Sequence, residues 1–349
     1  MSPGPRFRAF LERVSPETHF VVLCHSDADG LAAGAIFTRT LERIGRSVTA
    51  TVTGKGEGAW TPAVRGQVAA SNPGALIVTD LGSRPEPVVP GVPMLLVDHH
   101  RPLGVAPNAE LITGYGERPT PTSGLLAYWC CEAVADIADL KWIAALSILS
   151  DLGDEAEFTL LDEVRRQFRP ALLREATTLL NAARRSSSGN ARPALDILLR
   201  ARTPEDIVNS HSPEADYLRA CKAEVNAAFT EAKKAAPKFS GPVAIIRMHT
   251  PCQVHPLVAQ IWRTRLRKYI VMAVNTGFRP GYVHFSARCG PETNLIDFLR
   301  ANAPADTDEG YGHGHDQASG GALTYAAWNE FVQKLGFGPE MLVVEERVA

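Results

Sequence analysis

The 349-residue sequence lacks several features that would assign it to a special class of protein. No apolar run approaches the ~18 residues of a membrane span, so we expect a soluble protein with no membrane partner. The first residues carry charges and no apolar core, so we expect no secretory signal. The six cysteines form no CxxC pair, which predicts reduced thiols in a cytoplasmic protein.

The sequence also lacks a large excess of charge of either sign. Its 36 basic and 38 acidic residues give a formal net charge of -2, which excludes a histone-like polycation. A nucleic-acid enzyme is still compatible with this balance, because such an enzyme needs only a local basic patch. At roughly 150 residues per domain, the length predicts two domains.

The first half of the chain is typical of a parallel sheet covered by helices. Its short apolar runs do not alternate with polar residues, as expected for strands that are buried on both faces. We predict strands at 20–24, 48–53, 75–79 and 94–97, and helices after 30, at 122–138 and at 140–150. The fold class is therefore α/β, with a doubly wound N-terminal domain over residues 1–190.

A change in composition at 184–193 (RRSSSGNARP) indicates a boundary or hinge. We expect a helical linker over 191–238 and a smaller α/β C-terminal domain over 239–349, with a cleft between the domains. The pattern predicts strands at 242–248, 268–275 and 281–287, helices at 255–266 and 293–300, and a glycine- and histidine-rich segment, 310–321, that opens the last helix.

Acidic and histidine side chains follow the apolar runs of the first half. They are His25, Asp27, Asp29, Asp80, Asp98, His99, His100 and Asp151. Because ligands bind outside the carboxyl ends of parallel strands, we expect these residues to converge at one edge. Crowded carboxylates need cations, and carboxylates with imidazoles favour Mn²⁺, with Mg²⁺ as the second choice. Asp80 alone would also suit a helix N-cap.

These motifs resemble those of the DHH phosphoesterase superfamily. The matching stretches are HSDADG at 25–30, VTDLGS at 78–83, LLVDHH at 95–100, and ILSDLGD at 148–154. GHGHDQASGG at 312–321 resembles the GGGHxxAAG signature of the DHH-associated C-terminal domain, which occurs in the RecJ and nanoRNase branches. The HxDxDG spacing is closer to RecJ-type and archaeal relatives than to the HxxxDxD of the nanoRNase and pyrophosphatase branches.

The resemblance implies a site with two divalent cations, and it implies a role for each matching residue. His25 and Asp27 would hold one cation, Asp29, His99 and Asp151 would hold the other, and Asp80 would bridge both. Asp98 would orient a neighbouring histidine, and His100 would face the scissile phosphate. In the C-terminal domain the implied substrate contacts are Ser286, Arg288, His313, Gly314 and His315, of which His313 replaces a glycine of the usual signature.

We therefore expect a Mn²⁺-dependent phosphodiesterase or exonuclease that hydrolyses short single-stranded oligonucleotides or small nucleotides. The alternatives are hydrolysis of polyphosphate or pyrophosphate and, more remotely, an inactive nucleotide sensor, although every expected ligand position is filled. The compact length leaves no room for the extra OB-fold of full RecJ enzymes, which favours short substrates. The choice of DNA or RNA stays open, as does the oligomeric state, a homodimer included.

Three further groups of residues have a functional and a structural interpretation. His249, Cys252 and His255 suggest zinc, but without a fourth ligand they better suit a polar loop. GKGEG at 54–58 resembles part of a phosphate loop but lacks the GK[ST] ending. Arg263, Arg265, Arg267 and Lys268 would steer a polyanion or form a solvated helix face.

Overall fold

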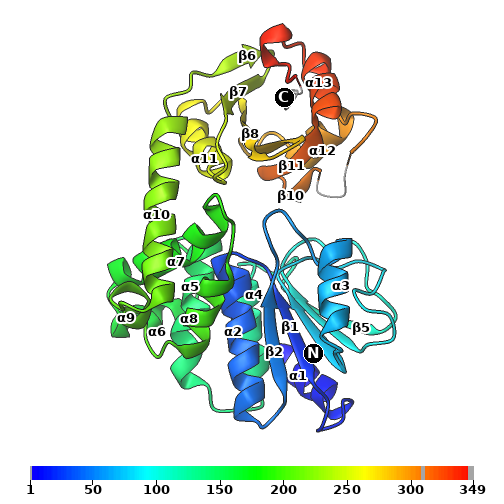
Figure 1. Ribbon diagram of the computed structural model, residues 1–349, viewed down its shortest axis with the longest axis vertical. Coiled ribbons are helices and arrows are strands. Elements are labelled where there is room, and N and C mark those ends of the chain that lie inside the picture. The colour runs from blue at the N-terminus through cyan, green and yellow to red at the C-terminus, as the bar shows by residue number, and fades with distance from the viewer. Residues whose placement is uncertain (1, 308–310, 345–349) are drawn as a thin grey trace. The chain divides into compact units, whose positions relative to one another are not determined.

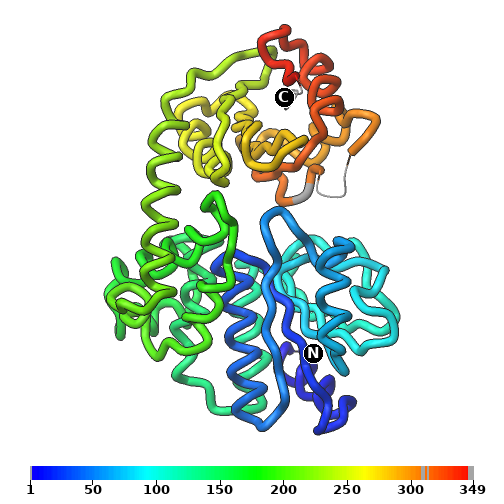
Figure 2. Tube along the Cα trace, viewed as in Figure 1, coloured from blue at the N-terminus to red at the C-terminus, as the bar shows by residue number. Residues whose placement is uncertain are grey.

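The computed structural model describes residues 2–307 and 311–344, and the chain divides into two compact units (Figures 1 and 2). The first unit comprises the chain up to Arg184 together with Gly189–Lys222. The second comprises Arg185–Ser188 and the chain from Ala223 onward. Two helices and part of a third within 191–238 thus belong to the first unit, so the segment expected as a linker contributes to its core.

The first unit contains a five-stranded, all-parallel sheet. Its order is β2-β1-β3-β4-β5, and its strands are β1 (Phe20–Cys24), β2 (Val48–Val52), β3 (Ala75–Thr79), β4 (Met94–Asp98) and β5 (Ala109–Thr113). Every residue of β1, β3 and β4 is buried, which is the continuous apolar pattern of strands covered on both faces. The predicted doubly wound α/β fold of this half is confirmed.

Helices cover both faces of this sheet (Figure 1). The helices of this unit before α10 are α1 (Pro3–Glu12), α2 (Ala28–Arg43), α3 (Pro62–Ala70), α4 (Ser123–Cys131), α5 (Lys141–Asp151), α6 (Thr159–Gln167), α7 (Pro170–Arg185), α8 (Arg192–Arg200) and α9 (Glu205–Val208). Successive residues of a strand point to opposite faces. Val22 and Cys24 accordingly pack with α2, α4 and α5, whereas Val21 and Leu23 pack with α3.

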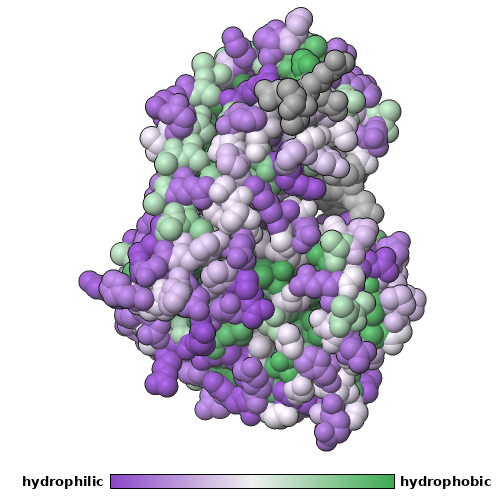
Figure 3. Space-filling view, in the orientation of Figure 1, coloured by the Kyte–Doolittle hydropathy of each residue, from purple (hydrophilic) through white to green (hydrophobic). Residues whose placement is uncertain are grey.

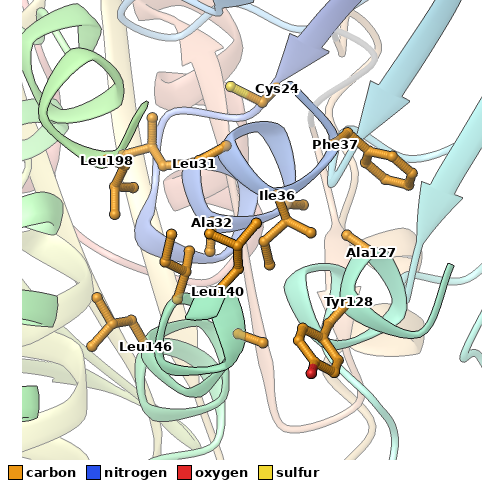
Figure 4. Close-up of a cluster of buried hydrophobic side chains, with 14 of the residues drawn as sticks. Cys24, Leu31, Ala32, Ile36, Phe37, Ala127, Tyr128, Leu140, Leu146 and Leu198 are labelled. Atoms are coloured by element: carbon orange, nitrogen blue, oxygen red, sulfur yellow. The ribbon is translucent and has the colours of Figure 1, made fainter. Parts of the chain in front are cut away.

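The larger of the two cores is centred on α2 (Figure 4). Leu31, Ala32 and Ile36 are fully buried and lie toward residues of α4, α5 and α8. Small residues let these elements approach closely: a Cβ on Gly34 would lie 2.9 Å from the sulfur of Cys24. The start of α2, which carries candidate ligands, is therefore held firmly against β1.

The second unit contains a six-stranded mixed sheet in the order β10-β11-β9-β8-β7-β6. Its strands are β6 (Lys238–Ser240), β7 (Val243–Met248), β8 (Ile270–Arg279), β9 (Tyr282–Arg288), β10 (His313–His315) and β11 (Ala318–Thr324). β7 and β8 are parallel and all other neighbours are antiparallel. The helices are α10 (Pro213–Ala232), shared between the units, α11 (His255–Arg265), α12 (Leu295–Ala301) and α13 (Tyr325–Lys334).

Several elements differ from the expectations. The helix expected at 122–138 ends at Cys131, and a short 3-10 helix precedes α5. The strands β5, β6, β10 and β11 were not predicted. The glycine-rich segment expected to open the last helix forms the β10–β11 hairpin instead, and α13 begins only at Tyr325. Glycine permits this because a Cβ on Gly320 would lie 2.6 Å from the carbonyl oxygen of Phe285.

The visible surface is largely polar, and the cysteines are buried. Hydrophilic residues cover most of the face seen in Figure 3. All six cysteines are free thiols and buried. Among the helices of the described residues, none has both the length and the apolar character needed to cross a bilayer.

Candidate metal centre

The parallel sheet brings eight candidate residues to one edge of the first unit. They come from the segments after β1, β3 and β4 and from the end of α5: His25, Asp27, Asp29, Asp80, Asp98, His99, His100 and Asp151. From β1 the chain passes to β2 on one side and then returns to β3 on the other. The carboxyl ends of β1 and β3 therefore flank the point where open α/β sheets bind ligands.

Asp80 lies at the centre of this edge in an unusual backbone conformation. Its φ is +60°, in the left-handed region that aspartate tolerates better than most residues. The turn begins directly after β3, where the Asp80 amide donates a hydrogen bond to the carbonyl oxygen of Val97. The side chain is almost fully buried, with 2% exposure. Such local strain is typical of functional sites.

A first set of ligand atoms is formed by His25, Asp27 and Asp80. Their ligand atoms lie within 4.8 Å of one another. His25 Nδ1 is 3.0 Å from an oxygen of Asp27 and 3.2 Å from an oxygen of Asp80. Burial opposes the charged form of His25, but the two carboxylates outweigh it and raise the pKa of this histidine to about 10.

A second set is formed by Asp29, His99 and Asp151, again within 4.8 Å. His99 Nε2 lies 3.8 Å from Asp29 and 3.4 Å from Asp151. The same nitrogen lies 3.5 Å from Asp80, so Asp80 adjoins both sets. Asp80, His99 and His100 form a third compatible combination. The geometry thus provides overlapping groups of carboxylate and imidazole ligands.

The carboxylates of this centre repel one another in the absence of a cation. Burial, together with neighbouring carboxylates, raises the pKa of Asp80 to about 6 and that of Asp151 to about 7. Burial and the neighbouring carboxylates also raise the pKa of Asp29 well above its usual range. Asp27 differs, because His25 and Arg184 overcome its burial and hold its pKa well below the usual range. This donor set therefore fits hard divalent cations.

Asp98 and His100 form a separate pair beside the ligand sets. Asp98 accepts hydrogen bonds from the amides of Gly82 and His100, both at 2.6 Å, and its Oδ1 is 3.0 Å from His100 Nδ1. Burial disfavours the charged imidazole, but Asp98 outweighs this and raises the pKa of His100 to about 9. The side chain of His100 keeps 40% exposure, so it is a protonated donor accessible to a ligand.

The N-terminus of α4 supports the centre, and sequence reasoning missed it. Both carboxylate oxygens of Asp29 accept amide hydrogen bonds, from Ser123 at 2.9 Å and Gly124 at 2.7 Å. The Ser123 hydroxyl also donates to Asp80 at 3.0 Å. The sequence did contain one indication of this helix N-terminus, because Thr122 is a good N-cap residue and caps α4 through its side chain. Thr122 marks where the helix begins, but it does not show which residues that end of the helix contacts.

Two residues of α7 also support the centre and were missed. Asn181 is buried, accepts a hydrogen bond from the amide of Ala28 at 3.2 Å, and donates one to the hydroxyl of Ser150 at 3.1 Å. It therefore links the segment between two aspartates to the residue before Asp151. One turn further, a guanidinium nitrogen of Arg184 lies 3.6 Å from Asp27. Asn181 and Arg184 lie far from the motifs in the sequence, so no local pattern indicated that they would contact the centre.

The predicted substrate residues lie in the second unit. Ser286 and Arg288 alternate in β9, and Arg288 donates a hydrogen bond to the Ser286 hydroxyl at 2.8 Å. Burial lowers the pKa of Arg288. His315 pairs with Ala318, which in turn pairs with Arg288. Gly314 has a φ of +129° and closely approaches the backbone of β11. The side chain of His313 lies outside the described residues.

In the part of the chain that the structure describes, the remaining motifs form no group of metal ligands. Among the side chains that the structure describes, compatible groups of three or more metal ligands occur only in the first unit. His249, Cys252 and His255 form no such group, and the amide of Cys252 bonds instead to the hydroxyl of Thr250 at 3.2 Å. Gly54 of the GKGEG stretch donates its amide to Glu57 at 2.9 Å, which is a local turn.

The chain is similar to known proteins in structure but not detectably in sequence. Neither a scan of family models nor a search of curated proteins found a match. RecJ from Thermus thermophilus is similar in its complexes with Mn²⁺ (TM-score 0.71, 18% identity) and Mg²⁺ (0.65, 16%). These matches cover 95% and 97% of this chain but 53% of each RecJ chain, so this chain spans about half their length.

Two other structures are similar over most of their own length. The DHH domain of a protein assigned to a family of ribosomal proteins matches with a TM-score of 0.67 and 13% identity, over 97% of this chain and 89% of its own. An exopolyphosphatase-related protein from Bacteroides fragilis matches with a TM-score of 0.53 and 14% identity, over 95% of each chain. At these identities the comparisons establish the fold.

Proposed function

Because the chain has the fold of the DHH phosphoesterase superfamily, we propose that it is a metal-dependent phosphoesterase. The observation that carries this proposal is the pair of ligand sets beside Asp80, at the carboxyl ends of the parallel strands. A structural function for these carboxylates is a poor explanation, since burying several like charges together costs free energy unless cations neutralise them.

In this proposal His25 and Asp27 hold one divalent cation, Asp29, His99 and Asp151 hold the second, and Asp80 serves both. Mn²⁺ is our first choice and Mg²⁺ the second, because the donors mix carboxylates with imidazoles and the RecJ structures contain these two ions. When bound, such a pair supplies an activated water molecule and neutralises charge on the phosphoryl oxygens.

The residues of the chain orient these ligands and supply a proton donor. The amides of Ser123 and Gly124 hold both oxygens of Asp29, and each oxygen keeps a second lone pair that could bind a cation. Asp98 keeps His100 protonated, so this imidazolium is suited to donate a hydrogen bond to a phosphoryl oxygen or a proton to the leaving oxygen. Placing positive charge where negative charge develops lowers the barrier.

In the second unit, Arg288, Ser286 and His315 would bind a phosphate of the substrate. The Arg288 guanidinium has no carboxylate within ion-pair distance among the described residues, so an anionic ligand would provide the missing partner. Gly314 and His313 complete the set that we propose for this region. Contacts remote from the reacting bond allow binding energy to position the substrate.

We further propose that the substrate is a short single-stranded oligonucleotide or a small nucleotide. The second candidate substrate is a phosphoanhydride such as polyphosphate. The structural similarity to an exopolyphosphatase-related protein supports this candidate. The test is incubation with Mn²⁺ and either a labelled dinucleotide or polyphosphate. Release of mononucleotides supports the first, orthophosphate from polyphosphate alone supports the second, and no turnover of either contradicts the enzyme.

A further inference from the structure

One arginine lies against the candidate metal centre. Nη1 of Arg184 is 3.6 Å from Oδ2 of Asp27, and the Arg184 side chain is only 20% exposed. Among the described residues, no other lysine or arginine lies within ion-pair distance of a carboxylate of either ligand set. Salt screens a partly buried pair of charges much less than an exposed one. A positive charge of the chain itself therefore adjoins the first ligand set, where a cation would bind.

The packing of α7 on α2 brings Arg184 to this place. Asp27 caps the N-terminus of α2, where its Oδ1 accepts a hydrogen bond from the amide of Gly30 at 3.0 Å. Asn181, one turn before Arg184 on α7, accepts a hydrogen bond from the amide of Ala28. The end of α7 is therefore held beside the first turn of α2, and the side chain one turn further along α7 reaches Asp27.

The contact between Arg184 and Asp27 lacks the geometry of a structural ion pair. At 3.6 Å it is longer than a hydrogen bond, whereas strong arginine–carboxylate pairs are commonly bidentate. Nε of Arg184 is also buried, and it has no hydrogen-bond partner among the described residues. The guanidinium meets Oδ2 of Asp27, the oxygen that also lies 3.0 Å from Nδ1 of His25. It therefore lies at the oxygen that faces the rest of the first ligand set, and a cation can displace it without breaking a hydrogen bond to Asp27.

Within the described part of the chain, the second ligand set has no such competitor. Asp27 and Asp29 are otherwise alike, because each accepts amide hydrogen bonds at the N-terminus of a helix. Each set also has one histidine, and Asp80 adjoins both. The second set, however, adds the carboxylate of Asp151, whereas the first set has the guanidinium of Arg184 beside it. Because Coulomb attraction grows with net negative charge, the second set should attract a divalent cation more strongly.

We propose that Arg184 competes with a divalent cation for Asp27 and makes the first ligand set the weaker of the two sites. The cations then bind in sequence, and the second ligand set fills first. Hydrolysis that needs both cations responds to metal concentration over the range in which the weaker site fills. The inference rests on the proposed function for the presence of two cations, and it adds the order in which they bind and the residue that sets this order.

The first experiment is a calorimetric titration of the full chain with Mn²⁺, in which electron paramagnetic resonance measures the free ion. The wild type should show two steps of unequal affinity. Arg184→Gln should tighten the weaker step about 5- to 50-fold, which lies between the effects of an exposed ion pair and of a buried charged hydrogen bond. Arg184→Lys keeps the positive charge and should therefore keep the weak step.

The matched control is Arg174→Gln, which is the same substitution on the same helix. Arg174 is 52% exposed and lies 3.3 Å from Asp154, outside both ligand sets, so this variant should leave both steps unchanged. Thermal unfolding gives a readout that a merely structural role of Arg184 would not move. In chelator, Arg184→Gln should melt earlier than the wild type, because Asp27 loses its neighbouring positive charge. A fixed concentration of Mn²⁺ should then raise the Tm of this variant more than that of the wild type.

Crystals soaked in limiting Mn²⁺ assign the two steps to the two sites. In the wild type, the anomalous peak at the second ligand set should have the higher occupancy, and Arg184→Gln should bring the two occupancies closer together. Unchanged affinities in Arg184→Gln, or a first ligand set that fills first in the wild type, would overturn the inference. The two proposals fail separately: two bound cations without turnover contradict only the phosphoesterase, whereas turnover with an unaltered Mn²⁺ titration in Arg184→Gln contradicts only the role of Arg184.

Discussion

Replacing Asp80 by asparagine should stabilise the metal-free protein and abolish its activity. Asparagine keeps the shape of the side chain, tolerates the φ of +60°, and can still accept the hydrogen bond from Ser123. It removes a charge whose burial raises the pKa from 3.8 to about 6. At 1.36 kcal/mol for each pKa unit, the relief at pH 8 is roughly 2–3 kcal/mol.

Thermal unfolding in chelator at pH 8 measures this relief. For a unit of this size, 1 kcal/mol shifts Tm by about 2–4 °C, so we expect an increase of about 4–12 °C over the wild type. Titration with Mn²⁺ should then show a weakened or lost binding step, and turnover of a dinucleotide should fall below detection. Asp80→Ala should be less stable than Asp80→Asn, because alanine is disfavoured at positive φ. A metal-free Asp80→Asn protein that melts earlier than wild type, or binds Mn²⁺ unchanged, would refute the reasoning.

The other predictions concern different parts of the account. His100→Gln should lower kcat about 10²- to 10⁴-fold in steady-state assays and leave bound metal unchanged. His315→Ala should raise KM more than it lowers kcat, and elemental analysis should show normal metal content. Gly124→Ala should destabilise the protein by about 1–3 kcal/mol in denaturant titrations, because its Cβ would lie 2.6 Å from Ser147. The raised pKa values of Asp151 and His100 mean that the metal-free protein binds extra protons when folded. Its Tm should therefore fall as pH rises from about 5 to 9, and Mn²⁺ should reduce that fall.

The central strands and the meeting of the candidate ligands at one edge of the sheet were predictable, because short-range patterns encode both. β1, β3 and β4 are continuous apolar runs, and each leads directly into acidic or histidine residues. Parallel topology alone then requires those residues to meet at one edge. The roles assigned to individual ligands came from the resemblance to a family, and they stay predictions until metal is located.

The elements that escaped prediction lack such patterns. β5 is a half-buried edge strand with mixed polarity, and β10 and β11 are rich in glycine, which has low strand propensity. Pairing with β9 rather than local preference makes β11 a strand. Asn181 accepts a hydrogen bond from the amide of Ala28, which lies 153 residues away in the sequence. Only the folded chain therefore reveals the contact.

The most direct test of the central claim is anomalous scattering from crystals of the protein soaked in Mn²⁺. The account predicts two peaks in the first unit, one contacted by His25 and Asp27 and the other by Asp29, His99 and Asp151, with Asp80 at both. Crystals with no anomalous peak at these side chains, or with manganese bound only elsewhere, would contradict it.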